Sequence, residues 1–230
     1  MHNAAFAALG IDAHYEAIHV PLGDLTAFVG MARAGQLDGF SVTTPLKSAI
    51  MGYLDGSTTD AREARSVNTV RRNGRTLEGH DTDGMGLIGA LADAFDWQPR
   101  GASALVLGSG PAGRAIGRAL RREGAVSVAC WSRNERTARE VGPPAHRPVD
   151  LVVSALPAAA VVPDSVLERI QPRTFVFDVN YAAARSPVPP GIGGARSDGL
   201  PLLLHQGALA FAWWTGKDAP LDAMRRAIGL

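Results

Sequence analysis

The segment ALVLGSGPAG, residues 104–113, decides the fold that we predict for this chain. Its four apolar residues predict a short buried strand, and the GxGxxG spacing that follows opens a predicted helix over 112–122. In such a turn the glycines permit a sharp bend, close approach of a pyrophosphate, and tight packing of helix on strand. Free amides at the helix start attract anions. A glycine-rich turn without a ligand is the alternative; the nucleotide interpretation assigns cofactor contacts to Gly108, Ser109, Gly110, Pro111, Ala112 and Gly113.

Further apolar runs follow at 126–131, 150–155 and 174–179, with helical segments between them. Strands that are buried on both faces of a parallel sheet have this composition, and the alternation predicts repeated βαβ units. The short polar segment 98–101 contains a proline and a glycine and is the best candidate for a domain boundary. The sequence therefore predicts an α/β protein of two domains.

The residues after the run 126–131 indicate which nucleotide binds. A carboxylate at this place holds the ribose hydroxyls of NAD, but this chain has Ser132, Arg133 and Asn134, with Arg136 just beyond. An arginine with a hydroxyl neighbour forms charge-assisted hydrogen bonds to a 2′-phosphate, which an acid would repel. We therefore predict NADP as the cofactor, the alternative being that these arginines belong to a solvated helix start.

The first half of the chain carries polar residues on predicted turns. The stretches GFSVTTPLK, ARSVNTV and GHDTDG supply Lys47, Asn68 and Asp83, which we expect to converge. Around them, Tyr15–Val20 is predicted as a strand and Asn73-Gly74 as a hairpin turn. An ammonium beside a carboxylate can hold a substrate hydroxyl and pass its proton while hydride leaves the same carbon. Taken singly, each residue has a simpler explanation: a surface lysine, a turn amide and a helix cap.

The bulk composition excludes several classes of protein. The 230 residues are 46% hydrophobic and 20% charged, with a net charge of +1, which is typical of a soluble protein and disfavours nucleic acid or membrane partners. The lone Cys130 excludes an intramolecular disulfide and fits a reducing cytoplasm. No apolar run approaches the length of a membrane span. The histidines show no metal-ligand spacing, so no metal is expected.

Several motifs, in this order, resemble those of the shikimate dehydrogenase family, including its shikimate/quinate dehydrogenase-like branches, over essentially the whole chain. They are HNAAF (2–6), SVTTPLK (41–47), VNT (67–69), DTDG (81–84), the glycine-rich turn, SRN (132–134), DGL (198–200) and QGALAF (206–211). The resemblance implies a substrate domain over 1–98, completed by helices of 200–230 that pack back on it, and a Rossmann-like, doubly wound NADP-binding domain over 99–199. It implies a role in chorismate and aromatic amino acid biosynthesis, as a monomer or homodimer.

The resemblance also implies roles for individual residues. Lys47 and Asp83 match the catalytic pair, and Asn68 and Gln206 match ligands of substrate hydroxyls, which suits amides because they both donate and accept hydrogen bonds. The other implied contacts are Thr43 in the substrate pocket, Tyr181 near the nicotinamide end of the cleft, and Gly199 at the cofactor.

Three features depart from the family pattern. The family begins with a strand and a Ser-x-Ser-Pro turn whose serines bind the substrate carboxylate, whereas this chain starts at Met1. If the strand and the two serines are truly missing, substrate binding is expected to be weaker by roughly 10²-fold to 10⁴-fold. Asp81 stands where the family usually has Asn, and a carboxylate near Asp83 would disfavour ionisation of one of the two. The turn 154–158 replaces a Thr-containing, glycine-terminated turn beside the nicotinamide.

Two functions are therefore compared. The preferred one is an NADP-dependent oxidoreductase that interconverts 3-dehydroshikimate and shikimate, or a close cyclic analogue such as quinate or aminoshikimate. The alternative is a catalytically weak or inactive dinucleotide-binding relative that lacks the carboxylate-binding serines. A methyltransferase fits less well, because Ser132 and Arg133 occupy the place of its ribose-binding acid. A methylenetetrahydrofolate dehydrogenase fits less well because Asn68, Asp83 and Gln206 suit a polyhydroxylated ring.

Overall fold

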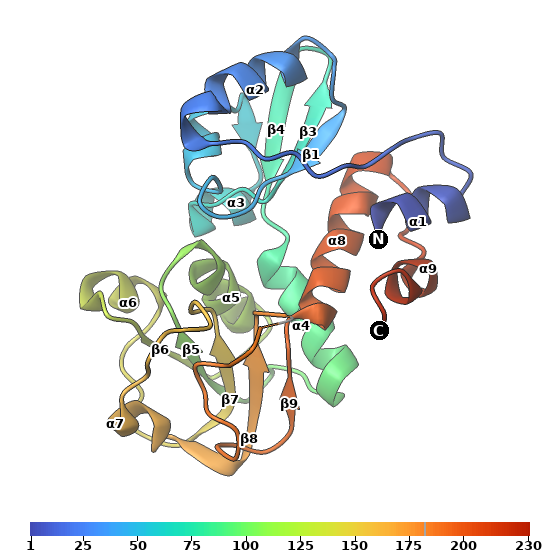
Figure 1. Ribbon diagram of the computed structural model, residues 1–230. Helices are drawn as coiled ribbons and strands as arrows, with labels where there is room; N and C mark the ends of the chain where they lie inside the picture. The colour runs from blue at the N-terminus through green and yellow to red at the C-terminus, as the bar shows by residue number, and fades with distance from the viewer. Residues whose placement is uncertain (182) are drawn as a thin grey trace. The chain divides into compact units, whose positions relative to one another are not determined.

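A computed structural model describes residues 1–181 and 183–230 of the chain (Figure 1). The described residues form two compact units. The first consists of Met1–Asp83 together with Gln206–Leu230, and the second is Gly84–His205. The α/β fold class predicted from the sequence is confirmed, because each unit contains a sheet with helices packed on it.

The two unit boundaries lie at helices rather than at the predicted segments near residues 98 and 200. Helix α4 (Asp83–Phe95) buries Leu87 and Leu91 completely in the core of the second unit. Helix α8 (Leu200–Thr215) is divided between His205 and Gln206. Because α4 packs its apolar face within the second unit, the polar segment 98–101 is a loop inside that unit.

The sheet of the first unit has the strand order β1-β3-β4-β2. The central pair, β3 (Thr69–Asn73) and β4 (Thr76–His80), is antiparallel and forms the predicted hairpin, with Gly74 in the left-handed region at φ 61°. Strand β1 (Gly39–Ser41) pairs antiparallel with β3, and the short β2 (Gly56–Ser57) pairs parallel with β4. The hairpin therefore fixes the position of Asn68, which directly precedes β3, and of residue 81, which directly follows β4.

Helices cover this sheet and line its edges (Figure 1). Helix α2 (Leu25–Arg33) packs Leu25 and Val29 against Phe40 and Val70 in one buried cluster. The helices of this unit, apart from α8, are α1 (His2–Ala8), the 3₁₀ helices η1 (Leu22–Asp24) and η2 (Ala49–Tyr53), α2 (Leu25–Arg33), α3 (Thr59–Ala64) and α9 (Leu221–Arg226).

The C-terminal segment packs on the N-terminal part of the chain, as predicted. The Phe211 ring lies 5.4 Å from the Phe6 ring, and Trp214 Nε1 donates a hydrogen bond to the carbonyl oxygen of Val70 at 2.9 Å. Gly39 leaves room for this indole, because a Cβ at Gly39 would lie 2.9 Å from the Trp214 ring. Residues from opposite ends of the sequence thus pack against one another within the first unit.

The predicted strand over Tyr15–Val20 is wrong. Residues 11–21 contain neither helix nor strand. The side chain of Asn3 takes the place of a neighbouring strand at Tyr15: it donates to the Tyr15 carbonyl at 2.8 Å and accepts the Tyr15 amide at 2.7 Å. The β-favouring composition of this segment is therefore overridden by a contact with a side chain distant in sequence.

The second unit contains a parallel sheet with the strand order β6-β5-β7-β8-β9. Alternate residues of β5 face two different apolar clusters. Ala104 and Val106 pack with α4 and with the helices α5 (Pro111–Arg122) and α6 (Glu135–Val141), whereas Leu105 and Leu107 pack with the region around the short helix α7 (Asp164–Leu167). Both faces are buried, which explains the continuous apolar runs in the sequence. The strands are β5 (Ser103–Leu107), β6 (Ser127–Trp131), β7 (Val149–Ser154), β8 (Ile170–Asp178) and β9 (Arg196–Ser197).

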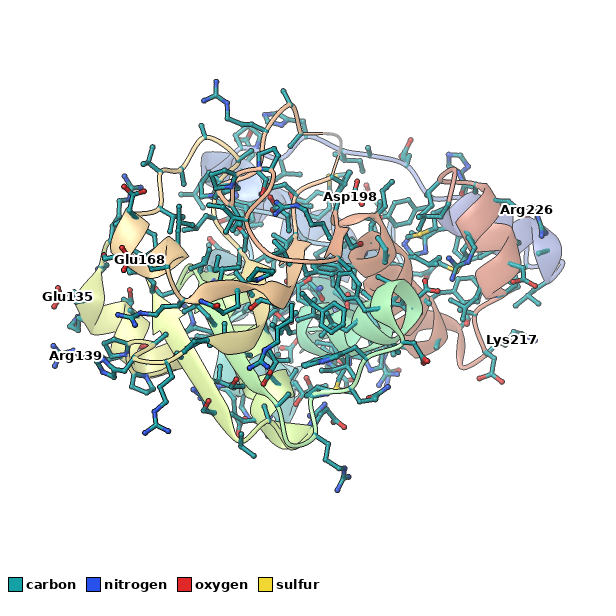
Figure 2. The ribbon with its side chains drawn as sticks, turned by 90° about the horizontal axis from the view of Figure 1, so that it is seen from below. Glu135, Arg139, Glu168, Asp198, Lys217 and Arg226 are labelled. Atoms are coloured by element: carbon teal, nitrogen blue, oxygen red, sulfur yellow. The ribbon has the colours of Figure 1, made fainter. Side chains whose placement is uncertain are left out.

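The crossover helices of this unit are α5 (Pro111–Arg122), α6 (Glu135–Val141) and the short α7 (Asp164–Leu167). The outer face of α6 is charged, and Glu135 and Arg139 form an exposed ion pair of 3.8 Å there (Figure 2). Among the described residues, none of the helices is both long and apolar enough to cross a bilayer.

The turn between β5 and α5 generates a stability prediction. A Cβ at Gly113 would overlap the carbonyl oxygen of Gly108, whereas a Cβ at Gly110 would meet nothing within 4 Å. Gly110 also has an ordinary φ of −70°. We predict that Gly113→Ala lowers the free energy of unfolding by about 3 kcal/mol and the melting temperature by roughly 5–10 °C.

Gly110→Ala is the matched control and should leave the melting temperature within roughly 1 °C. Thermal unfolding followed by circular dichroism measures both variants. Equal melting temperatures for the two variants would show that Gly113 does not hold the turn by close packing.

Candidate functional site

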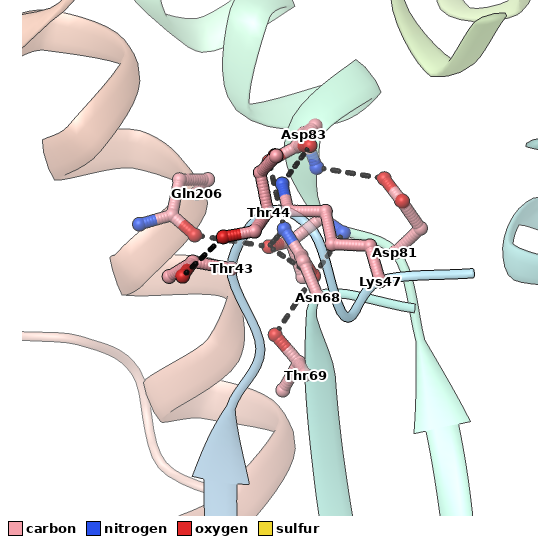
Figure 3. Close-up of polar contacts among 9 residues, drawn as sticks. Thr43, Thr44, Lys47, Asn68, Thr69, Asp81, Asp83 and Gln206 are labelled. Carbon is pink, nitrogen blue, oxygen red and sulfur yellow. Dashed lines mark hydrogen bonds and ion pairs between the residues drawn. The ribbon is translucent and has the colours of Figure 1, made fainter. Parts of the chain in front are cut away.

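Lys47 and Asp83 form an ion pair in the first unit (Figure 3). Lys47 Nζ lies 2.6 Å from Asp83 Oδ2, and the two side chains are only 15% and 9% exposed. Lys47 comes from the turn after β1, where its own carbonyl accepts the amide of Val67 at 2.9 Å, and Asp83 is the first residue of α4. The two residues that the sequence predicts as the catalytic pair are therefore in direct contact.

Asn68 orients this pair. Its Nδ2 donates to Asp83 Oδ1 at 2.8 Å and to Thr82 Oγ1 at 3.0 Å. Its Oδ1 accepts the Thr82 amide at 3.0 Å and the Thr69 hydroxyl at 2.9 Å. An amide side chain has two donor and two acceptor positions. The four hydrogen bonds of Asn68 to protein groups therefore use all of these positions. Asn68 is 3% exposed and fixes the Asp83 carboxylate.

Asp81 adds a second carboxyl group beside Asp83. Its Oδ1 accepts the backbone amide of Asp83 at 3.0 Å. Burial and, after it, the nearby Asp83 carboxylate raise the pKa of Asp81 to about 7, against the opposing effect of the Lys47 ammonium. Of two carboxyl groups this close together, one is expected to resist ionisation, and the raised pKa of Asp81 agrees with that expectation.

Gln206 approaches the same cluster from α8. Its Oε1 accepts the Thr82 hydroxyl at 3.5 Å, so the amide side chain faces the turn that carries Asp83 (Figure 3). Thr43 is exposed on the turn before Lys47, and its hydroxyl donates a hydrogen bond to the neighbouring Thr44 carbonyl at 3.4 Å. Gln206 thus joins the hydrogen-bonded network, and Thr43 lies at its exposed margin.

In the second unit, the glycine-rich turn lies at the carboxyl end of β5, between its neighbours β6 and β7. The chain leaves β5 toward β6 and later returns to the other side as β7, so this is a switch point of the sheet, where ligands bind in open α/β folds. Gly108 has φ 111°, and a Cβ there would lie 2.9 Å from the Ala155 carbonyl oxygen. Glycine is therefore required at Gly108 by conformation and by space.

The first turn of α5 presents free amide groups. Gly110 precedes Pro111 at the helix start and provides no side-chain cap, so the amides of Ala112 and Gly113 have no helical partner. The Ser109 hydroxyl lies 2.6 Å from the Thr137 hydroxyl, which ties the turn to α6. Backbone amides arranged in this way can bind an anion.

The residues after β6 lie next to this turn in the sheet, because Trp131 is paired with Leu107. Arg133 and Arg136 are exposed, and neither has a hydrogen bond to another described residue. Asn134 caps α6 by accepting the Thr137 amide at 3.2 Å, and its own amide approaches the Ser132 hydroxyl at 3.4 Å. Asn134 therefore has a structural task in addition to its predicted cofactor contact.

The remaining predicted residues also lie in the second unit. Tyr181 is 49% exposed. Gly199 is buried, its amide donates to the Asn180 carbonyl at 3.0 Å, and a Cβ there would overlap the Val179 carbonyl. The turn 154–158 is held by Asn180, whose Nδ2 donates to the Leu156 carbonyl at 2.8 Å. Gly199 is thus explained by close packing of the backbone.

Sequence reasoning missed three residues that hold the site. Thr69 and Thr82 complete the hydrogen bonds of Asn68, and Thr137 fixes the glycine-rich turn. All three are hydroxyl side chains next to residues that the motifs do select. Thr69 and Thr82 could have been identified from the sequence, because they lie inside the VNT and DTDG motifs. Thr137 lies in none of the motifs.

Comparison with known proteins identifies the family. Residues 1–70 match the model of the shikimate dehydrogenase substrate binding domain, and residues 199–228 match the shikimate 5′-dehydrogenase C-terminal domain. The chain is 34% identical over 266 residues to the shikimate dehydrogenase (NADP(+)) of Methanopyrus kandleri, covering 99% of this chain and 89% of that protein. The corresponding protein of Geobacter metallireducens is also 34% identical, with 99% and 90% coverage.

A solved structure gives the same result. The shikimate 5-dehydrogenase of Thermus thermophilus, in complex with NADP(H) and shikimate, superposes with a TM-score of 0.86 at 33% identity, covering 98% of this chain and 91% of that one. The sequence matches extend over both units, and each unit holds the polar residues that the motifs select. The chain belongs to the shikimate dehydrogenase family.

Proposed function

We propose that this protein interconverts shikimate and 3-dehydroshikimate with NADP as the cofactor. The observation that carries the proposal is the largely buried Lys47–Asp83 ion pair at 2.6 Å, oriented by Asn68. The family relatives named for this reaction support the substrate, and the hydrogen-bonding side chains around the pair suit a ring with several hydroxyls. Quinate and aminoshikimate are close analogues that the same groups accommodate.

The two residues of the pair have different roles: Lys47 transfers the proton, and Asp83 positions Lys47. Lys47 holds the substrate hydroxyl and takes up its proton during oxidation; in the reverse direction its ammonium donates the proton to the oxygen that develops negative charge. Asp83 keeps the lysine in place through the 2.6 Å contact and provides a carboxylate that accepts a hydrogen bond. Partial burial of both side chains strengthens these interactions, because the local dielectric constant is low.

The second unit supplies the groups that fit NADP. The space beside Gly110 is open, so the backbone there can be approached closely, and the free amides of Ala112 and Gly113 suit a pyrophosphate. Arg133 and Arg136 suit a 2′-phosphate, because their guanidinium groups have no other partner among the described residues. When bound, the nicotinamide accepts or returns the hydride.

The central test replaces the lysine of the pair. Lys47→Ala should reduce kcat for shikimate oxidation by about 10²-fold to 10⁴-fold, because the general base is lost. The dissociation constant for NADPH should remain within roughly twofold, since the free amides and arginines stay unchanged. Initial rates at the nicotinamide absorbance band and fluorescence titration with NADPH provide the two readouts.

Lys217→Ala is the matched control. Lys217 is the other lysine of the chain and is exposed after α8 (Figure 2), so its removal should change neither readout. A Lys47→Ala variant that keeps wild-type kcat, or that loses NADPH affinity as much as kcat, would contradict the assignment of Lys47.

The cofactor site is tested at Gly110. A methyl group at this position enters the open space that the pyrophosphate is proposed to use, without strain in the fold. Gly110→Ala should therefore weaken NADPH binding by about tenfold or more, a loss of about 1.4 kcal/mol, while the melting temperature without cofactor stays unchanged. Unchanged NADPH affinity in this variant would place the pyrophosphate elsewhere.

A further inference from the structure

Asp81 uses one of its two carboxyl oxygens. Oδ1 accepts the amide of Asp83 and so ties the turn to the first residue of α4. Oδ2 is buried and has no hydrogen bond with any described residue. The Ser66 hydroxyl faces this carboxyl and favours its ionised form, yet Ser66 Oγ is also buried outside hydrogen-bond geometry. The residue as a whole is 3% exposed.

The fold itself does not need this second oxygen. Asparagine binds a helix-start amide as well as aspartate does, and its amide nitrogen would give the Ser66 oxygen a donor. An unpartnered carboxylate oxygen in a buried place costs free energy. Asparagine at residue 81 would therefore perform the structural task at a lower cost. Unlike the amide of asparagine, the carboxyl group of aspartate can lose and regain a proton.

Two charged groups face Asp81: the Asp83 carboxylate on α4 and the Lys47 ammonium on the turn after β1. Ser66, from the segment between α3 and β3, is uncharged. Burial and the Asp83 carboxylate raise the pKa of Asp81 to about 7. Since its pKa is raised, Asp81 is neutral below about pH 7 and becomes charged above it. The same carboxyl group is thus next to both members of the ion pair.

We propose that Asp81 is a positioning residue that gains and loses a proton beside the Lys47–Asp83 pair, and that its ionised form keeps Lys47 protonated. While Asp81 is neutral, the Lys47 ammonium faces one carboxylate; after ionisation it faces two, and loss of its proton becomes harder. Ionised Asp81 therefore favours Lys47 as a proton donor, which serves reduction, over Lys47 as a proton acceptor. This consequence for turnover rests on the proposed function. The effect of Asp81 ionisation on the Lys47 proton, which we call the charge coupling, does not depend on that function.

The coupling is measured on the lysines directly. The chain has two, Lys47 and the exposed Lys217, so protein labelled with ¹³C-lysine gives one site signal and one internal reference. We expect the Lys47 Cε signal of the wild type to show a step near pH 7. In Asp81→Asn this step should be absent, because an asparagine side chain does not ionise. The Lys217 titration should be the same in both proteins.

Ser66→Ala is a second variant that leaves every charge in place. Because it removes the hydroxyl that favours ionised Asp81, it should move the step to higher pH, and it tests the proposal even if Asp81→Asn does not fold. A Lys47 titration that is identical in wild type and Asp81→Asn, or no step near pH 7 in the wild type, would overturn the proposal, as would a step that Ser66→Ala leaves unmoved.

Kinetics separate this proposal from the proposed function. In Asp81→Asn the rise of kcat for shikimate oxidation with pH should move to lower pH, because Lys47 releases its proton more readily. A merely structural role of Asp81 would change kcat by the same factor at every pH, and that result would count against the proposal. Absence of turnover with shikimate in the wild type would overturn the proposed function, while the lysine titrations would still decide the role of Asp81.

Discussion

The ion pair between Lys47 and Asp83 is the constraint on which the first unit depends. Two charges at 2.6 Å and largely out of water are held stably only if hydrogen bonds satisfy the rest of each group. Asn68 meets this requirement for Asp83, and the β3–β4 hairpin is what brings Asn68 next to the turn after β4. The helices of the C-terminal segment then pack on the same sheet and add Gln206.

The second unit is governed by a different requirement, the close approach of backbone to backbone. Gly108 and Gly113 allow β5 to turn directly into α5, and the hydroxyls of Ser109 and Thr137 hold that turn against α6. The result is a row of free amides at a switch point of a parallel sheet, with Arg133 in the adjacent loop. In the second unit the groups available for binding are backbone amides beside glycines, whereas in the first unit they are polar side chains that hydrogen-bond to one another.

The strongest sequence signals concern residues whose chemistry is tied to a local pattern. The apolar runs predicted the parallel strands, and Asn73-Gly74 predicted the hairpin. The order of the motifs, which resembles that of the shikimate dehydrogenase family, selected Lys47 and Asp83. The failures involve contacts distant in sequence. Nothing near Tyr15 indicates that Asn3 would occupy its backbone groups, and no local composition marks α4 as part of the second core. The burial of Asp81 likewise emerges only from the packed structure.

The most direct test of this account is the initial rate of NADPH formation by the wild-type chain with shikimate and NADP. We expect a rate that saturates with shikimate and that depends on NADP in preference to NAD, because Arg133 and Arg136 suit the 2′-phosphate. A chain that binds NADPH yet forms none from shikimate, quinate or aminoshikimate would contradict the claim that the Lys47–Asp83 pair acts on a cyclic hydroxy acid.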